Sequence, residues 1–423
     1  MYIIRGKTSV IWSIKTAPFR KRYQEFSEFF TSIHLLSPSG VAPRLLRDNE
    51  EQDNMRAFTF ESHIPLQEWK AKKPQLEVFL NQEILNIVNS PEDRNIVHIF
   101  TAKAPLTESL EWSDSLIYVD ANYINLGAMH CGYAHLNLVA NPHTFVAGET
   151  GSGKTNLLKS VIYQCLYHGH TVKLIDFKRG VSFSAFSNHL EIYSEYEEIA
   201  VVLDDLVEET KRRLDLFREM RVEELSDYNK EVDNVNSENA ENKLSRIVVV
   251  IDELAELMRA SSKEATRNIT ASLETLTRLS RAVGINLIMG LQRPDATIVN
   301  GQIKNNVSTR ICGRFIDPEP SRIMLGTDRA TKLPKVKGRF VMRDDEVKEF
   351  QAFYMKEESM GHLFELNYQY VVAKEHAMYE AQLAKEAKEL SLAEELAEAQ
   401  GVEKEILPEE EFRFVFDDVE VEA

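Results

Sequence analysis

The segment GETGSGKT, at residues 148–155, has the residue types and spacing of a phosphate-binding loop. In the pattern G-x-x-x-x-G-K-[ST], backbone N–H groups surround a phosphate, so side chains would obstruct the site and small residues are needed. Lys154 would neutralise charge on the β- and γ-phosphates, and the Thr155 hydroxyl would bind Mg²⁺. We therefore expect ATP and Mg²⁺ as cofactors. The expected cofactor-binding residues are Gly148, Glu149, Thr150, Gly151, Ser152, Gly153, Lys154, Thr155 and Asn156.

Two acidic residues follow the apolar run IVVVI and would complete this site. Asp252 would hold the hydration shell of Mg²⁺ opposite Thr155, and Glu253 would polarise the attacking water, because phosphoryl transfer needs positioning and charge neutralisation. Gln292 ends another apolar run and is suited to contacting the γ-phosphate. A polar cap at the end of a strand is the alternative interpretation of Gln292.

The apolar patterns around these residues predict alternating strands and helices. Strands are expected at 143–147, 171–177, 246–253 and 285–295, and helices at 156–167 and 210–225. Residues 230–243 read as a polar insertion. Strands that alternate with helices indicate an α/β fold with a parallel sheet and crossover helices. The polar ends of the strands then lie at one edge of the sheet, beside the phosphate loop.

The length of 423 residues predicts two or three domains. Residues 1–50 form a basic N-terminal segment that touches anionic lipid or DNA, or is simply solvated. Residues 51–118 are expected to form a small α/β domain, with strands at 57–62 and 95–102 and a helix at 68–85. Residues 373–423 are expected to form a helical acidic tail, which either is solvated or docks a partner. The tail holds most of the net charge of −17.

The sequence predicts a cytoplasmic protein without a transmembrane helix or a signal peptide. The apolar N-terminal residues are interrupted by Arg5, Lys7 and Lys15. The cysteines at 131, 165 and 312 are far apart and lack the spacing of metal ligands, which suits a reducing compartment. Contact with the inner face of the cell membrane would then be peripheral, through partners.

Several longer motifs resemble the motor domain of the FtsK/SpoIIIE translocase family in order and spacing. The matching runs are AGETGSGKTN, LIDFKRGVSF, ETKRRLDLFREMRVEELSDYN, VVVIDELAELM, RLSRAVGINLIMGLQRPD, IKNNVSTRICGRFIDPEPSRIMLG and KGRFV. The resemblance implies a RecA-like ATPase motor, which we place at residues 119–372. It also implies a hexameric ring that pumps double-stranded DNA.

The same resemblance assigns roles to single residues. It places Gly148, Gly153, Lys154 and Thr155 in the phosphate loop, Asp252 and Glu253 in the second nucleotide motif, and Gln292 as a sensor. It makes Arg310 the candidate arginine finger that reaches a neighbour's γ-phosphate, with a structural salt bridge as the alternative. Glu253, Lys154, Arg310 and Gln292 are therefore the expected catalytic residues.

The segment 310–343 is locally basic, with nine Lys or Arg residues and three acidic residues, and it faces either DNA phosphates or the outer surface. Chromosome-segregating members of the family have membrane-spanning segments and a terminal winged-helix module, and neither is visible in the sequence. We therefore expect the coupling ATPase of a conjugative or integrative element, with relaxosome or secretion-channel proteins as partners. We expect the DNA that it moves to be double-stranded rather than single-stranded. The rival interpretations are a protein-export motor similar to the type VII secretion ATPases and a scaffold that does not hydrolyse ATP.

Overall fold

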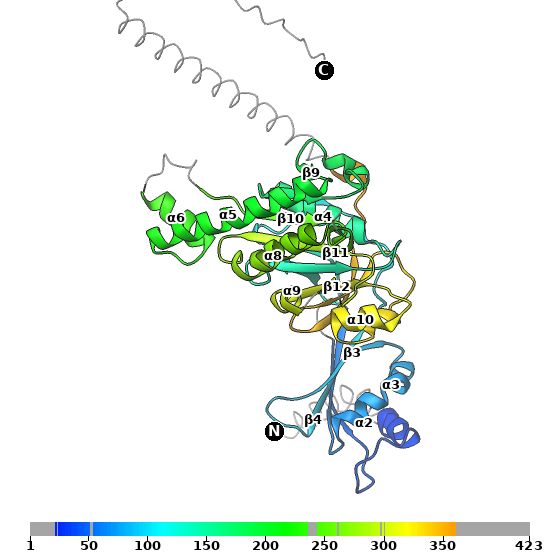
Figure 1. The fold of residues 1–423 in the computed structure, drawn as a ribbon. Helices are drawn as coiled ribbons and strands as arrows, with labels where there is room; N and C mark the ends of the chain where they lie inside the picture. Colours follow the sequence, from blue (N-terminus) through cyan, green and yellow to red (C-terminus); the bar gives the residue numbers. More distant parts are fainter. Residues whose placement is uncertain are drawn as a thin grey trace, which may run out of the picture. The chain divides into compact units, whose positions relative to one another are not determined.

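The computed structural model describes residues 22, 24–50, 54–235, 243–259, 262–296, 298–299 and 301–360. The strands among these residues form two separate sheets (Figure 1). The predicted acidic tail at 373–423 and most of the N-terminal segment lie outside the described residues. In the described part of the chain, no helix has the length and apolar character needed to span a bilayer.

The small N-terminal sheet is antiparallel, with the order β1-β2-β4-β3. Its strands are β1 (Arg44–Glu50), β2 (Met55–Glu61), β3 (Glu83–Asn89) and β4 (Ile96–Ala102), and its helices are α2 (Leu66–Ala71) and α3 (Lys73–Leu80). Buried aromatic side chains fill its core. They are Phe26, Phe30, Phe58, Phe60 and Trp69.

Two expectations for this small domain need correction. Residues 44–50 form β1 and pair with β2, so this part of the basic N-terminal segment belongs to the small sheet and not to a separate domain. The helix expected over 68–85 is divided at Lys72 and ends before Asn81, whose backbone is left-handed with φ 51°. A left-handed residue stops a helix, and the chain then turns into β3.

The large sheet has the order β6-β5-β14-β13-β12-β7-β11-β10-β8-β9 and is mostly parallel. Its parallel strands are β7 (His143–Ala147), β8 (Thr171–Ile175), β9 (Glu191–Tyr193), β10 (Ile247–Ile251), β11 (Ile285–Leu291) and β12 (Thr309–Gly313). The antiparallel strands are β5 (Tyr123–Ala128), β6 (Tyr133–Asn137), β13 (Arg339–Arg343) and β14 (Val347–Ala352). This arrangement confirms the expected α/β class.

Helices cover both faces of the large sheet. One face packs against α5 (Tyr196–Met220), α6 (Leu225–Val235), α7 (Leu254–Leu257), α8 (Lys263–Leu279), α9 (Gly301–Asn306) and α10 (Pro318–Leu325). The other face packs against α4 (Lys154–Tyr167) and the 3₁₀ segment Val181–Phe186. Because both faces are covered, β7, β10 and β11 are buried along their whole length and are mainly apolar, with His143, Thr144 and Asn286 as buried polar exceptions.

Residues 225–235 form α6, although the sequence predicted a polar insertion from residue 230. Leu225, Tyr228 and Val232 recur at helical spacing and pack into the core of the large sheet. Most of the other residues of α6 are charged or polar, and they obscured the helical pattern in the sequence.

Candidate nucleotide-binding site

The phosphate loop lies between the end of β7 and the start of α4. Its Gly151 and Gly153 have φ values of 86° and 104°, which L side chains rarely adopt. Hydrogen bonds hold both ends of the loop, because Gly148 N–H donates to Leu291 O at 3.0 Å and Gly338 N–H donates to Ser152 O at 2.8 Å. The N-terminus of α4, a helix of 14 residues, therefore faces a preformed backbone cradle that suits an anion.

Lys154, the first residue of α4, is buried against the predicted second nucleotide motif. Its ammonium donates to the main-chain oxygen of Asp252 and lies 3.4 Å from Asp252 Oδ1 and 3.5 Å from Glu253 Oε2. The two acidic residues follow β10, more than 90 residues further along the chain. The structure thus brings together the three charged residues that the sequence had placed at one edge of the sheet.

Glu253 is held by two backbone N–H groups. Gln292 N–H donates to Oε2 at 2.9 Å, and Ala255 N–H donates to Oε1 at 3.4 Å at the start of α7. Burial raises the pKa of Glu253 above its ordinary value, while Lys154 and the two N–H groups act in the opposite direction. A carboxylate that is desolvated but fixed in position is suited to accept a proton from water.

The oxygen atoms beside Lys154 suit a hard divalent cation. Asp252 is 3% exposed, and its Oδ1 atom is buried without a hydrogen-bond partner among the described residues. Thr155 follows Lys154 and lines the same pocket. Mg²⁺ prefers such oxygen ligands together with water and phosphate oxygens. Thr155 and Asp252 are therefore the residues that would hold it.

A pocket of about 800 Å³ extends from the phosphate loop to the residues after β14. Tyr354, Met355 and Lys356 line its far end, and the Tyr354 side chain is 47% exposed. Asn156 ties this segment to α4, because its Nδ2 donates to Phe353 O and its Oδ1 accepts from Met355 N–H at 3.1 Å. Asn156 thus helps to form the pocket by joining two segments of the chain. The sequence analysis missed Tyr354.

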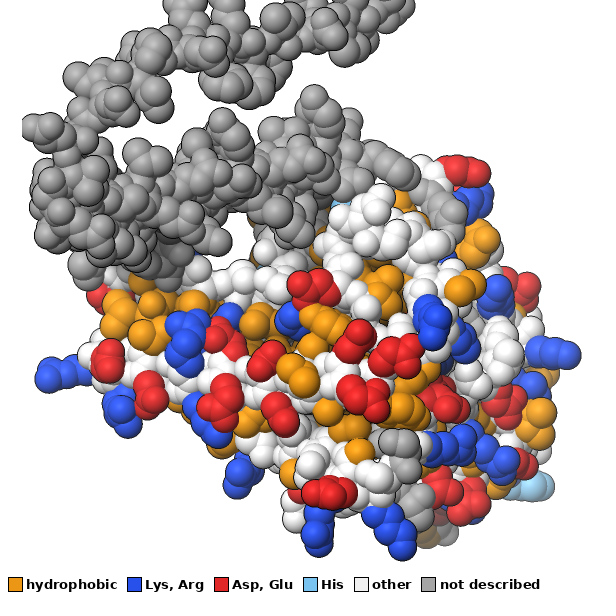
Figure 2. All heavy atoms as spheres, turned by 45° about the horizontal axis from the view of Figure 1, so that its top comes forward, with side chains coloured by type: hydrophobic (Ala, Val, Ile, Leu, Met, Phe, Trp, Pro, Cys, Tyr) orange, Lys and Arg blue, Asp and Glu red, His pale blue; other side chains and the backbone are white. Residues whose placement is uncertain are grey.

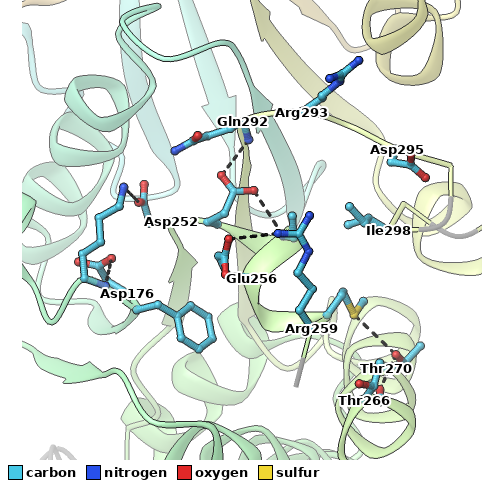
Figure 3. A pocket seen from close by; sticks show the side chains of 15 residues that line it. Asp176, Asp252, Glu256, Arg259, Thr266, Thr270, Gln292, Arg293, Asp295 and Ile298 are labelled. Carbon is cyan, nitrogen blue, oxygen red and sulfur yellow. Dashed lines mark hydrogen bonds and ion pairs between the residues drawn. The ribbon is translucent and has the colours of Figure 1, made fainter. Parts of the chain in front are cut away.

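A second cavity, of about 910 Å³, opens beside the ends of β8, β10 and β11 (Figure 3). Asp176, Asp252 and Gln292 lie along one side of it, and Asp295 and Ile298 lie across from them. Glu253 also lines this cavity. Gln292 and Lys178 line both this cavity and the phosphate-loop pocket, so they stand where the two meet. The sequence analysis had singled out Gln292 but not Lys178.

Arg310 lies near the start of β12, in register with Phe145 of β7, which precedes the phosphate loop. Its guanidinium donates to the main-chain oxygens of Lys304 at 2.8 Å, Val307 at 3.2 Å and Met324 at 3.3 Å. Burial lowers its pKa from the ordinary value. Among the described residues, Arg310 does not line either cavity, so the structure does not bring it to the phosphate loop of its own subunit.

The basic segment at 310–343 also contains cations with internal partners. Besides Arg310, the Arg339 guanidinium bonds to Glu349, Gln351 and two main-chain oxygens, and Arg343 donates to Leu325 O. Part of the local positive charge therefore stabilises the fold. On the face of the molecule in Figure 2, acidic and basic side chains are mixed.

Comparison with known proteins gives consistent matches. A family model described as the FtsK/SpoIIIE family matches residues 111–296. A DNA translocase FtsK from Staphylococcus aureus strain Mu50 is 36% identical over 202 residues, which is 45% of this chain and 25% of the relative. A DNA translocase FtsK from Streptococcus agalactiae is 34% identical over 230 residues, which is 51% of this chain and 28% of the relative. The chain thus spans about a quarter of the length of these curated relatives.

Solved structures also resemble the fold. The pCW3 conjugation coupling protein TcpA, solved as a monomer form with ATPγS, is 36% identical and superposes with a TM-score of 0.60. That match covers 82% of this chain and 99% of the TcpA chain. EssC (ATPases 2 and 3) from Geobacillus thermodenitrificans is 17% identical, with a TM-score of 0.51 over 63% of this chain and 53% of its own, and shows similarity of fold alone.

Proposed function

Because the chain belongs to the FtsK/SpoIIIE family, we propose that it is an ATPase that moves double-stranded DNA as the coupling ATPase of a conjugative or integrative element. One observation carries the ATPase part of this proposal. The Lys154 ammonium lies 3.4 Å from the Asp252 carboxylate and 3.5 Å from the Glu253 carboxylate, beside a preformed phosphate loop. DNA as the cargo is supported by the names of the relatives, FtsK DNA translocases and a conjugation coupling protein.

Each residue of the site has a defined task in hydrolysis. The loop N–H groups and Lys154 hold the β- and γ-phosphates, and Glu253 orients the attacking water and accepts its proton. Thr155 and Asp252 would hold Mg²⁺, which would neutralise charge on the phosphates. Gln292 stands at the junction of the two cavities, where it would contact the γ-phosphate.

The far end of the phosphate-loop pocket would take the nucleoside. The Tyr354 ring is exposed toward this pocket, although its main chain is fixed by hydrogen bonds to Leu110 and Trp112. A rigid aromatic face presents a stacking surface for a purine base. We assign Tyr354 as the platform for the adenine of ATP.

The ring assembly and the arginine finger are the finer parts of this proposal. In a hexamer, Arg310 would act on the γ-phosphate of a neighbouring subunit and not on its own. Its guanidinium is bonded to three main-chain oxygens of its own subunit, so contact between subunits would have to change these bonds. A structural role is the alternative, and mixed subunits separate the two.

The test is ATP turnover by the purified chain with and without double-stranded DNA. Lys154→Ala should abolish turnover, and Glu253→Gln should bind ATP but turn over at least about 10²-fold more slowly. Lys211→Ala, on the exposed face of α5, is the matched control and should behave as wild type. Near-normal turnover of either site variant would remove this site from the mechanism. Turnover without DNA stimulation at low salt, from a ring confirmed by light scattering, would favour protein export instead.

A further inference from the structure

Lys178 follows β8 and lies on the opposite side of Asp252 from Lys154. Its ammonium is 3.9 Å from Asp252 Oδ2, whereas Lys154 approaches Oδ1 of the same carboxylate. The Lys178 side chain is 58% exposed and extends into the cavity system from the third strand along from β7. Two cations therefore flank one carboxylate at the edge of the sheet.

The backbone around Lys178 is fixed by a buried aspartate. Asp176 is 2% exposed, and its two carboxylate oxygens accept from Lys178 N–H at 3.0 Å and Gly180 N–H at 2.9 Å. Gly180 has φ 73°, and a Cβ atom there would lie 2.6 Å from Ile192 Cδ1. The turn is thus specified by its own residues, and it presents Lys178 at a constant position.

The position of Lys178 is distinct from that of the other lysines near the phosphate loop. Lys337 and Lys356 line the phosphate-loop pocket but not the cavity that contains Glu253. Lys356 is also paired with Glu111 at 2.8 Å. Among the described lysines, Lys178 alone lines both spaces. A cation at this junction would lie between a phosphate bound at the loop and the Glu253 carboxylate.

The charges of the site also favour a lysine in addition to Lys154 and Mg²⁺. Asp252 and Glu253 already share the ammonium of Lys154, and the terminal phosphate adds further negative charge. In phosphoryl transfer, charge builds up on the oxygens of the transferred group, and a preorganised cation stabilises it. A lysine on a fixed turn has a flexible stem that can reach from Asp252 to such an oxygen.

We infer that Lys178 is a second catalytic cation, which contacts a γ-phosphate oxygen of ATP and stabilises the transition state. The inference rests on the proposed ATPase function. In the reaction, water oxygen bonds to the γ-phosphorus, the bond from that phosphorus to the bridging oxygen of ADP breaks, and Glu253 accepts the proton of water. Lys178 forms no covalent bond and provides charge only.

The experiment compares Lys178→Ala and Lys178→Arg with Arg179→Ala. Arg179 is the neighbouring exposed cation, pairs with Glu195 at 2.9 Å and lines neither cavity. For each purified variant, kcat is measured with DNA, and the Kd for ATP is measured by titration. We expect Lys178→Ala to lower kcat by about 10²-fold while Kd changes by less than about threefold. Lys178→Arg should recover part of kcat, and Arg179→Ala should match wild type.

Each other outcome counts against the inference. A kcat for Lys178→Ala equal to that of Arg179→Ala would overturn it, as would a weaker Kd with unchanged kcat. Equal loss of kcat in Lys178→Ala and Arg179→Ala would assign the effect to the turn and not to the cation. If the wild-type chain does not hydrolyse ATP, the proposed function is wrong and so is the inference about Lys178. If the wild-type chain hydrolyses ATP but Lys178→Ala has normal kcat, only the inference is wrong.

Discussion

Replacement of Gly153 by alanine should weaken ATP binding much more than it destabilises the protein. The backbone of Gly153 has φ 104°, and a left-handed conformation costs an L residue about 1–2 kcal/mol. The new Cβ atom would also lie 2.9 Å from Gly338 N and 3.0 Å from Gly338 Cα, which are backbone atoms. One of the two segments must move, and the hydrogen bond from Gly338 N–H to Ser152 O, worth about 1 kcal/mol, is lost.

The backbone strain and the lost hydrogen bond together cost about 2–3 kcal/mol. In the absence of ATP, the loop can avoid this cost by leaving the cradle conformation. ATP binding must then restore that conformation, so the Kd should rise by about 30- to 150-fold at 1.4 kcal/mol per factor of ten. The matched control is Gly132→Ala, because Gly132 also has a positive φ, of 68°, but no atom lies within 4 Å of its added Cβ. That variant should lose about 1–2 kcal/mol of unfolding free energy and keep the wild-type Kd.

The assay is equilibrium titration with a fluorescent ATP analogue, together with urea unfolding of the same samples. A Kd for Gly153→Ala within about threefold of wild type would show that the contact with Gly338 does not hold the loop in its binding conformation. An equal increase in Kd for Gly132→Ala would refute the reasoning in another way, because that residue does not line the pocket.

Three further predictions concern other parts of the chain. Tyr354→Ala should raise the Kd for ATP about tenfold without changing the Kd for inorganic tripolyphosphate, which has no base. Tyr354→Phe should bind ATP as the wild type does. Equal effects of Tyr354→Ala on both ligands would exclude base stacking. Burial lowers the pKa of His143 from 6.5 to about 4, so the unfolded state binds a proton first as the pH falls. The contribution of His143 to the free energy of unfolding is therefore complete above pH 6.5, and about 2 kcal/mol of it should be lost between pH 7 and 5. Urea unfolding measures this loss, which should be smaller in His143→Gln. Mixed rings of Arg310→Ala and Lys154→Ala subunits should regain ATPase activity that each variant lacks, because some interfaces pair an intact loop with an intact finger; co-assembled rings that stay inactive would leave Arg310 with a structural role.

The parts of the fold that the sequence predicts well are those with local signals. The strands β7, β10 and β11 are buried on both faces, so each is a mainly apolar run that can be recognised without knowledge of its partners, with His143, Thr144 and Asn286 as the polar exceptions. The phosphate loop is similarly local, because its glycines, Lys154 and Thr155 are consecutive or nearly so. Asp252 and Glu253 could be placed beside it from the rule that the carboxyl ends of parallel strands share one edge.

The parts that the sequence analysis missed depend on contacts between distant segments. Tyr354 reaches the pocket because the chain there bridges to Glu111, more than 240 residues earlier. Lys178 lies in the family motif LIDFKRGVSF, but the motif assigns it no role, and its place beside Asp252 follows from a turn held by the buried carboxylate of Asp176. The basic composition of 310–343 likewise does not reveal that Arg339 is 6% exposed and bonded inside the fold.

The contacts of Lys154 also determine how the affinity for ATP is set. Its ammonium is already bonded to the main-chain oxygen of Asp252 and paired with two carboxylates, so an incoming phosphate must compete with internal anions for the same cation. Binding is then an exchange of partners, and the measured affinity is the small difference between two strong interactions. A modest change in the internal anions, such as protonation of Glu253, would therefore shift the occupancy of the site by ATP. In the site without ATP, the Asp252 and Glu253 carboxylates thus compete with phosphate for the Lys154 ammonium.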